Sequence, residues 1–371
     1  MSNYFFFFEY ILLGDLMKKI LLFLLLLIPL NIFALEVSSK SAILMDEDTG
    51  RILYSKNIDD KRLIASTTKI MTAILGVESG KLDDIVKVKD DILEAYGSNI
   101  YLSIDEEITL LDLVYGLMLR SGNDAAIAIS SYVSGSVDEF VKLMNKKAKE
   151  LNMTNTSFCN PHGLDEKCEN ISTARDMALL TKYANSNETY KKIVGTKRHV
   201  AKSNLKTYDW YNKNKLLSTY EYTTGGKTGF TEKARRTLVT TASKDGINLI
   251  VVTLNDPNDF TTHKDLYEYG FNNYQKYLIL SKKKFNLDNK YYDKVYIKND
   301  ISYLFKEDEV DKVYIKYVID KVDNPKNKDK VGRVEVYIDN KKRITEDIFV
   351  SIKEKNNKKI GLFERFINLF K

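Results

Sequence analysis

A serine and a lysine stand three positions apart in the stretch Ala65-Ser66-Thr67-Thr68-Lys69, directly before a mostly apolar run over residues 70–77. The apolar run predicts a buried helix, and residues three apart on a helix lie on one face about one turn from each other. A serine hydroxyl is a poor nucleophile at neutral pH unless a neighbouring group takes its proton. Because burial lowers the pKa of a lysine, Lys69 is a candidate base for Ser66.

Two further motifs follow in the chain. Ser121-Gly122-Asn123 comes after an apolar helix predicted over residues 110–119, and a second helix is predicted from Ala125. Lys227-Thr228-Gly229 leads into a β-rich stretch. Each motif alone has an ordinary interpretation as a turn or a strand. Together, the order Ser-x-x-Lys, Ser-x-Asn, Lys-Thr-Gly is the motif set of penicillin-recognising serine acyl enzymes.

On these residues the chain resembles the D-alanyl-D-alanine carboxypeptidases, which are low-molecular-mass penicillin-binding proteins. The resemblance extends to a hairpin around Asp48-Thr49-Gly50 and to the segment Asn160-Pro161-His162-Gly163-Leu164. It implies an α+β fold of the β-lactamase/transpeptidase type, in which an antiparallel sheet packs against a helical cluster. A small β-rich C-terminal domain and an amphipathic helix would follow the catalytic domain.

The resemblance also implies a reaction. Ser66 would attack the carbonyl between the two terminal D-alanines of a peptidoglycan stem peptide, form an acyl-enzyme and release one D-alanine, and β-lactam antibiotics would be covalent inhibitors. Lys69 is expected to be the acylation base. Backbone N–H groups of Ser66 and Phe230 would form the oxyanion hole.

Further roles are implied for the other motif residues. Ser121 and Lys227 would relay a proton to the leaving amine and hold positive potential near the substrate carboxylate. Asn123 would bond the substrate amide or orient Lys69, and Thr228 would bind the terminal carboxylate. The remaining expected substrate contacts are Gly229, Phe230, Thr231 and Lys213.

Two of these positions depart from the family pattern. Members commonly have histidine after the Lys-Thr-Gly triplet, where this chain has Phe230, so a side-chain role there is lost. Lys213 stands in a segment where the carboxypeptidases often have an arginine for the substrate carboxylate. A lysine there acts as a point charge without bidentate geometry.

Other enzyme classes fit the sequence less well. The three histidines, His162, His199 and His263, have no partner at metal-ligand spacing, so neither a metal nor another cofactor is expected. The same scarcity disfavours a Ser-His-Asp triad. Glu166 and Glu169 do not form the Glu-x-x-Leu-Asn pattern of class A β-lactamases. A non-catalytic penicillin or muropeptide sensor, or a weak β-lactamase, stays the alternative.

Charge and cysteine content indicate the environment of the protein. The net charge of +6 is spread along 371 residues, which favours some attraction to anionic lipid or wall polymers and no nucleic-acid partner.

Cys159 and Cys168 stand nine positions apart. An exported location permits a disulfide between them, but the sequence leaves a bond and two free thiols equally open.

The order of segments predicts four regions. Residues 1–34 are expected to be a signal peptide, with an uncleaved N-terminal anchor as the alternative. Residues 1–16 are a possible mis-assigned start before Met17. Residues 35–282 would form the catalytic domain, with a hairpin over 237–242 and 247–254 and a final helix over 263–280. Alternating strands over 286–352 predict the β domain.

The last region, residues 353–371, combines a basic run with an amphipathic helix over 360–371. Such a helix is typical of binding to an anionic membrane surface, and a helix docked on the β domain is the alternative. The expected location is the outer face of the cytoplasmic membrane.

Overall fold

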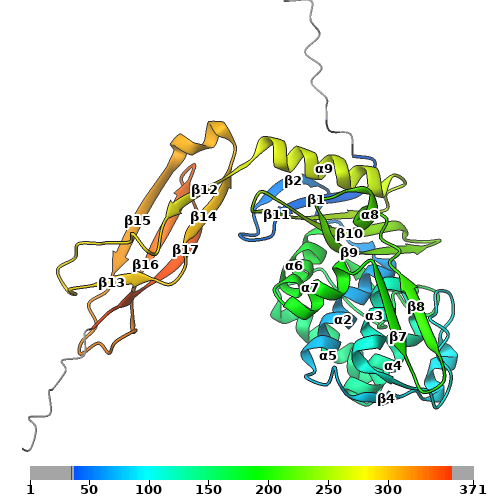
Figure 1. Cartoon of the computed structure of the whole chain (residues 1–371). Coiled ribbons are helices and arrows are strands. Elements are labelled where there is room, and N and C mark those ends of the chain that lie inside the picture. The colour runs from blue at the N-terminus through cyan, green and yellow to red at the C-terminus, as the bar shows by residue number, and fades with distance from the viewer. Residues whose placement is uncertain (1–34, 36, 353–371) are drawn as a thin grey trace, which may run out of the picture. The chain divides into compact units, whose positions relative to one another are not determined.

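The computed structural model describes residue 35 and residues 37–352, and the chain divides into two units, residues 1–36 and residues 37–371. Every element below belongs to the second unit (Figure 1). The predicted signal peptide, residues 1–34, and the predicted C-terminal region, residues 353–371, lie outside the described residues. Within the described part of the chain, no helix has the length and apolar character needed to cross a bilayer.

A five-stranded antiparallel sheet forms the centre of the catalytic part, in the order β2-β1-β11-β10-β9. Its strands are β1 (Ser41–Asp46), β2 (Ile52–Lys56), β9 (Thr223–Thr231), β10 (Arg235–Lys244) and β11 (Ile247–Leu254). Both predicted hairpins are confirmed, since β1 pairs with β2 and β10 with β11. Because β9 lies at the edge of the sheet, one side of this strand is available to the site.

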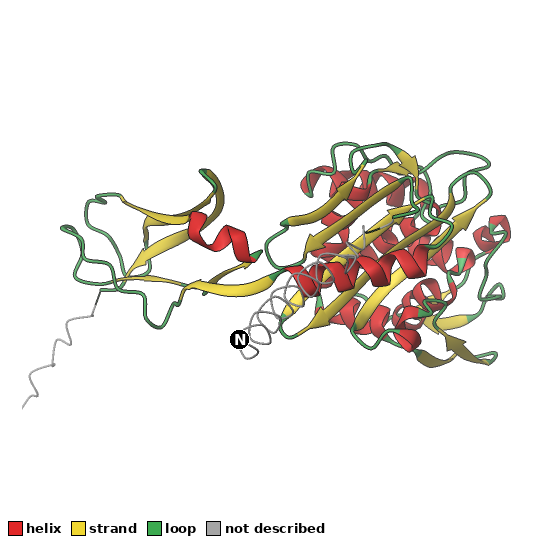
Figure 2. Ribbon diagram, turned by 90° about the horizontal axis from the view of Figure 1, so that it is seen from above, coloured by secondary structure: helices red, strands yellow, loops and turns green. Residues whose placement is uncertain are grey.

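Helices cover both faces of this sheet (Figures 1 and 2). One face shares a core with a helical cluster, in which Ile43, Val239 and Val252 of the sheet pack with the helices. On the other face, Gly270 of α9 packs against Leu44 and Leu249. The helices are α2 (Lys69–Glu78), α3 (Leu110–Arg120), α4 (Asn123–Ser134), α5 (Val137–Glu150), α6 (Ala174–Asn185), α7 (Glu188–Gly195), α8 (Leu216–Thr219) and α9 (Asp259–Asn273).

The helix predicted over residues 263–280 is wrong in its second half. Helix α9 ends at Asn273, and the chain continues as strand β12 (Gln275–Leu280). Two asparagines end the helix, and side chains of Tyr277 and Ile279 then point to one side with the period of a strand. The β-rich part of the chain therefore begins at Gln275.

This β-rich part contains a two-stranded sheet, β12-β14, and a four-stranded sheet, β13-β17-β16-β15. The strands predicted from alternation are confirmed, because Val334, Val336 and Ile348 point into a common core. The strands are β13 (Val295–Ile297), β14 (Ile301–Phe305), β15 (Val313–Ile319), β16 (Lys330–Ile338) and β17 (Lys341–Val350).

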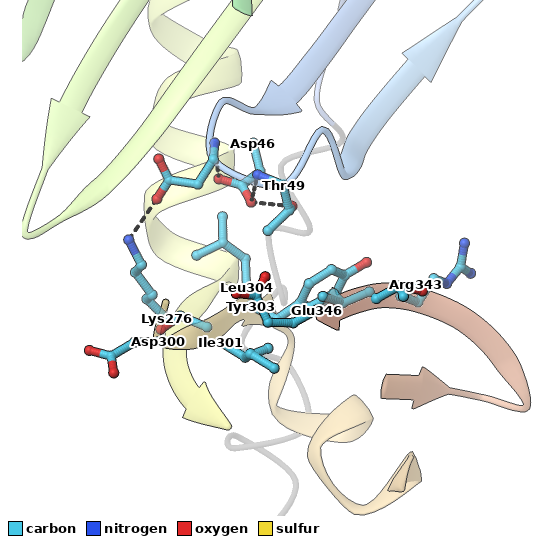
Figure 3. Close-up of a pocket in the computed structure, with 13 residues that line it drawn as sticks. Asp46, Thr49, Lys276, Asp300, Ile301, Tyr303, Leu304, Arg343 and Glu346 are labelled. Atoms are coloured by element: carbon cyan, nitrogen blue, oxygen red, sulfur yellow. Dashed lines mark hydrogen bonds and ion pairs between the residues drawn. The ribbon is translucent and has the colours of Figure 1, made fainter. Parts of the chain in front are cut away.

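Three short antiparallel pairs complete the fold: β3 (Arg62–Leu63) with β6 (Ile171–Ser172), β4 (Ile85–Lys87) with β5 (Glu107–Thr109), and β7 (Arg198–Lys202) with β8 (Thr207–Tyr211). A hollow of about 460 Å³ is lined by Asp46, Thr49 and Lys276, together with residues of β14 and β17 (Figure 3). None of the predicted catalytic residues lines this hollow, so the reactive groups lie elsewhere.

Candidate active site

Ser66 lies in a tight turn directly before helix α2. The turn, Ala65–Thr68, is a 3-10 helix, and α2 begins at Lys69. The sequence predicted a helix that opens at the serine, whereas the structure has a sharper turn there. The reason is the positive φ of 45° at Ala65, which redirects the chain just before the nucleophile.

Lys69 is fully buried and has three hydrogen-bonding neighbours. Its Nζ lies 3.0 Å from Ser66 Oγ, 2.7 Å from Asn123 Oδ1 and 2.6 Å from the carbonyl oxygen of His162. A neutral amine has two N–H groups and one lone pair. Since Asn123 and His162 can only accept at these atoms, the lone pair is left for the Ser66 hydroxyl proton.

Electrostatics favour this neutral form. Burial lowers the pKa of Lys69 well below its ordinary value, and the positive charges of Lys227 and Lys213 lower it further, against the opposing effect of Asp124. Burial, with the charge of Lys213, also lowers the pKa of Lys227 to about 7. The three lysines therefore act on one another, as expected for groups gathered at one site.

Asn123 is held by the loop that precedes strand β5. Its backbone N–H donates to the Ser98 carbonyl at 2.7 Å, and its Nδ2 donates to the Tyr96 carbonyl at 2.5 Å. The bond from Nδ2 to Tyr96 leaves Oδ1 of Asn123 pointing toward Lys69, which agrees with the hydrogen bond that Oδ1 accepts from Lys69 Nζ. Ser121 ends helix α3 in the left-handed conformation, with a φ of 65°, and is buried.

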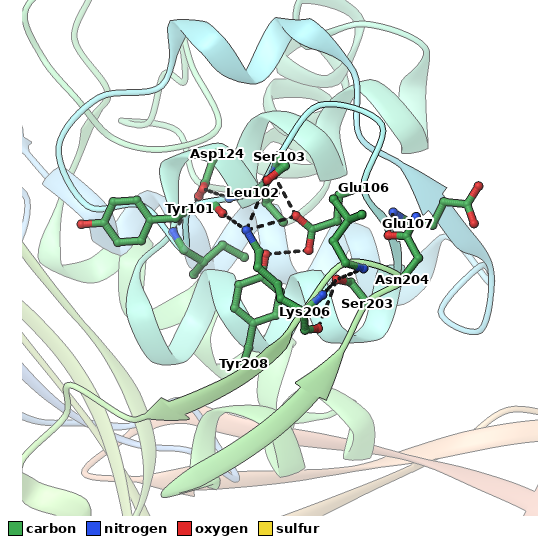
Figure 4. A network of polar contacts seen from close by, with 12 residues as sticks. Tyr101, Leu102, Ser103, Glu106, Glu107, Asp124, Ser203, Asn204, Lys206 and Tyr208 are labelled. Carbon is green, nitrogen blue, oxygen red and sulfur yellow. Dashed lines mark hydrogen bonds and ion pairs between the residues drawn. The ribbon is translucent and has the colours of Figure 1, made fainter.

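The far end of the same loop is fixed by a polar network (Figure 4). Asp124 Oδ2 accepts from the Leu102 N–H at 3.0 Å. The buried Glu106 accepts from the Ser103 N–H at 2.9 Å and from the Tyr208 hydroxyl at 2.7 Å. Lys206, between β7 and β8, donates to the Tyr101 carbonyl at 2.5 Å. Sequence reasoning missed Asp124 and Glu106 because both bind backbone N–H groups, and the side-chain partner of Glu106, Tyr208, is 102 residues away in the chain.

Strand β9 brings the third motif against the nucleophile. Lys227 is buried and donates to the Thr228 carbonyl at 2.8 Å. A Cβ on Gly229 would lie 2.4 Å from Thr237 Oγ1 and 3.0 Å from the Ser66 nitrogen, so it would clash with the neighbouring strand and crowd the nucleophile turn. Thr228 and Thr231 are partly exposed, and the Phe230 side chain is exposed.

Lys213 lies at the exposed side of the same cluster. Its Nζ is 3.2 Å from Ser98 Oγ, and the Ser98 carbonyl accepts from the Asn123 N–H, so Lys213 lies beside the site, where its charge lowers the pKa values of Lys69 and Lys227. Partial desolvation and the charge of Arg120 lower the pKa of Lys213 itself. Lys213, which departs from the arginine common in the family, therefore lies together with the motif residues.

A loop over residues 159–168, which we call the strap, supplies the His162 carbonyl. Cys159 and Cys168 are joined by a disulfide, which settles the alternative that the sequence left open. A Cβ on Gly163 would lie 1.9 Å from the Ala65 carbonyl oxygen, so the strap lies directly on the nucleophile turn. The His162 side chain accepts from the Leu164 N–H at 3.1 Å.

A buried lysine beside a serine, an asparagine that orients the lysine and a Lys-Thr-Gly edge strand define a serine acyl-transferring hydrolase of the penicillin-recognising type. Comparison with known proteins agrees. The family model for D-alanyl-D-alanine carboxypeptidase, peptidase family S11, matches residues 30–258. The chain belongs to this family.

Relatives and solved structures give the extent of the similarity. The chain is 40% identical over 220 residues to the D-alanyl-D-alanine carboxypeptidase DacF of Bacillus subtilis, which covers 58% of this chain and 56% of that protein. It is 35% identical over 251 residues to DacC of Escherichia coli, over 64% of this chain and 62% of that protein. The chain thus matches less than two thirds of the length of these two relatives.

The fold extends further than the sequence match. Penicillin binding protein 5 from Haemophilus influenzae superposes with a TM-score of 0.73 at 28% identity, over 85% of this chain and 97% of that one. The predicted combination of a catalytic α+β part and a β-rich part is confirmed at this level.

Proposed function

We propose that this protein is a serine-type D-alanyl-D-alanine carboxypeptidase that removes the terminal D-alanine from peptidoglycan stem peptides. The observation that carries the proposal is the environment of Lys69, whose Nζ lies 3.0 Å from Ser66 Oγ with two fixed acceptors at its other positions. Family membership supports the same substrate class.

The reaction follows from the arrangement of these groups. Ser66 Oγ attacks the carbonyl carbon of the scissile peptide bond while its proton passes to the neutral Lys69 amine. Backbone N–H groups of Ser66 and Phe230 stabilise the oxyanion, each contributing about 3 to 4 kcal/mol by analogy with other hydrolases. Ser121 relays a proton to the leaving amine, the C–N bond breaks and D-alanine departs. Water then hydrolyses the Ser66 ester.

The substrate carboxylate would meet the cationic side of the site. Lys213 and Lys227 provide positive charge there, and the Thr228 hydroxyl donates a hydrogen bond. β-Lactam antibiotics, which also present a carboxylate beside a reactive carbonyl, would acylate Ser66. The two glutamates of this region both have other partners, since Glu166 of the strap accepts from the Tyr96 hydroxyl and Glu169, just after the strap, lies 3.4 Å from Lys233. We therefore expect slow deacylation of penicillin.

The test is D-alanine release from diacetyl-lysyl-D-alanyl-D-alanine by the purified protein and by Ser66→Ala. Release that disappears in the variant supports the carboxypeptidase. Binding of stem peptide without release, equal in both proteins, would instead identify a sensor. Rapid nitrocefin hydrolysis would contradict slow deacylation and favour a β-lactamase.

We further propose export by the segment 1–34 and attachment to the outer face of the cytoplasmic membrane by residues 353–371. Support comes from the sequence alone: a charged start and leucine-rich centre in the first segment, and phenylalanines beside lysines in the second. A peripheral location would place the site near peptidoglycan and limit cross-linking during wall synthesis.

A further inference from the structure

The strap joins three separate parts of the site. Its His162 carbonyl accepts from Lys69 Nζ at 2.6 Å. Asp165 Oδ2 accepts from the Thr231 hydroxyl at 2.5 Å, at the end of strand β9. On the other side, Glu166 accepts from the Tyr96 hydroxyl, in the loop whose carbonyl holds Asn123. A displacement of the strap would therefore disturb the base and both walls of the site.

The two ends of the strap are joined by Asn170 and by the antiparallel bridge between Ser157 and Ile171, but its two halves are anchored unequally. At the start, Asn170 Oδ1 accepts from the backbone N–H groups of Cys159 and Asn160, and Asn160 Oδ1 accepts from Gly163 at 2.7 Å. After Asp165, the chain is exposed at Glu166 and Lys167. Lys167 has only an exposed salt bridge to Glu94 at 3.3 Å, a contact of small energetic value.

The outer side of the strap does not rest on a packed core. It borders a cavity of about 420 Å³ lined by both cysteines, His162 and Leu164, with Tyr96 and Ile127 among the facing residues. Side chains along such a cavity lose the dispersion contacts that hold a loop in a close-packed interior. The disulfide is the covalent constraint on this half of the strap.

We infer that the Cys159–Cys168 disulfide is a positioning element for catalysis, which holds the His162 carbonyl against Lys69 by closing the strap into a ring. The inference rests on the proposed function, because it concerns acylation of Ser66. Without the bond, the strap from Asp165 onward is held by the contacts of Asp165 with Thr231 and Lys233, by the Glu166–Tyr96 hydrogen bond and by the exposed Lys167–Glu94 pair. The His162 carbonyl then no longer accepts a hydrogen bond from the Lys69 amine, and the lone pair of that amine is no longer directed at Ser66.

A loosened strap also admits water to Lys69. The charged groups that face this amine are Lys227 of β9, Lys213 beside the loop and Asp124 of α4. None of them changes when the disulfide opens, whereas the burial of Lys69 decreases. Hydration favours the ammonium form, so acylation should require a higher pH in the open state.

The experiment measures the second-order rate constant for acylation of Ser66 by a fluorescent penicillin as a function of pH, with the full chain in detergent. The oxidised protein is compared with Cys159→Ser/Cys168→Ser and with protein reduced by dithiothreitol. Reduction moves two electrons and two protons from this dithiol to the two sulfurs, breaks the S–S bond and leaves the reagent as a cyclic disulfide. Free thiols are counted before and after.

We expect acylation to slow roughly tenfold in both open forms, as for other small misplacements of a catalytic group. The acid limb of the pH profile should move to higher pH, which a loss of stability alone would not cause. Reoxidation should restore the rate. Lys167→Ala is the matched control, because it removes an outer contact of the strap, keeps the disulfide and should leave the rate unchanged.

Equal rates and pH profiles in the oxidised and reduced proteins would overturn the inference, and so would two titratable thiols in the unreduced protein. If the double variant does not fold, the reduced wild-type protein decides. Failure of the oxidised protein to acylate at all would overturn the proposed function together with the inference. Normal acylation in every form would overturn the inference alone.

Discussion

Lys69 is surrounded by groups that either accept its N–H bonds or repel its charge. Asn123 and His162 accept, and Lys213 and Lys227 disfavour the ammonium form. Of these four residues, Asn123 and Lys227 could be predicted from motifs, because spacing along the chain identifies them. The role of the His162 carbonyl could not be predicted, because every residue has a backbone carbonyl and the residue type does not reveal which one binds Lys69.

Lys213→Met tests the electrostatic coupling at the scale of one residue. Removing this positive charge makes protonation of Lys69 easier, so the pKa of Lys69 should rise and the acid limb of β-lactam acylation should move to higher pH. kcat/KM for the tripeptide should fall roughly tenfold, as expected for loss of one charge-assisted contact to the substrate carboxylate.

Stopped-flow acylation and D-alanine release measure these two effects. Lys215→Met, an exposed lysine two residues further along, serves as the control and should change neither. An unchanged acid limb in Lys213→Met would show that Lys213 does not influence the base.

At the scale of elements, the site depends on close backbone contacts between the nucleophile turn, the strap and strand β9. A Cβ at Gly163 would collide with this turn, and a Cβ at Gly229 would crowd the turn and clash with Thr237 of β10. The sequence marks both as glycines within motifs, but glycine is common in turns. Only the structure distinguishes a glycine required by a close approach from one required by its φ angle.

Gly163→Ala and Gly135→Ala separate these two requirements. Both glycines have positive φ, 93° and 83°, but a Cβ at Gly163 would lie 1.9 Å from the Ala65 oxygen while nothing lies within 4 Å at Gly135. Each variant should lose about 1 kcal/mol of stability from the φ angle. Gly163→Ala should in addition lose acylation by roughly a hundredfold, because the nucleophile turn must shift.

Thermal unfolding and penicillin acylation of the two variants provide the measurement. Equal acylation by both would contradict the assignment of Gly163 as a contact of the nucleophile turn.

For the whole molecule, stability should depend on a histidine far from the reaction. His263 of α9 is fully buried, with Nδ1 2.6 Å from the Thr240 hydroxyl and Nε2 3.0 Å from the Thr253 hydroxyl. Burial lowers its pKa from 6.5 to about 3. Between these values the unfolded chain binds a proton that the folded chain does not, so stability falls as the pH falls through this window.

This effect should destabilise the protein by about 2 to 3 kcal/mol at pH 4.5 relative to pH 7. Denaturant unfolding at both pH values measures it. In His263→Gln the loss between pH 7 and pH 4.5 should shrink by that amount, even if the variant is less stable at both. The same loss in both proteins would assign the acid sensitivity to other groups.

Membrane association is a second property of the whole molecule, and here the prediction rests on sequence. Deleting residues 360–371 should move the protein from the membrane pellet to the supernatant, because the apolar half of the predicted helix would be lost. D-alanine release should stay near normal. Continued pelleting of the shortened protein would contradict a membrane role for this segment.

The sequence by itself determined the family and the α+β architecture and predicted Ser66, Lys69, Asn123 and Lys227 as site residues, because helical spacing, strand alternation and ordered motifs are properties of contiguous chain. It failed where α9 gives way to β12, since Tyr274, Tyr277 and Leu278 also have the i, i+3, i+4 spacing of an amphipathic helix. The tertiary structure decided the disulfide, the His162 carbonyl on Lys69 and the approach of Gly229 to Ser66. Two of these contacts join segments far apart in the chain, and the disulfide depends on how a loop closes, so no local pattern could specify them.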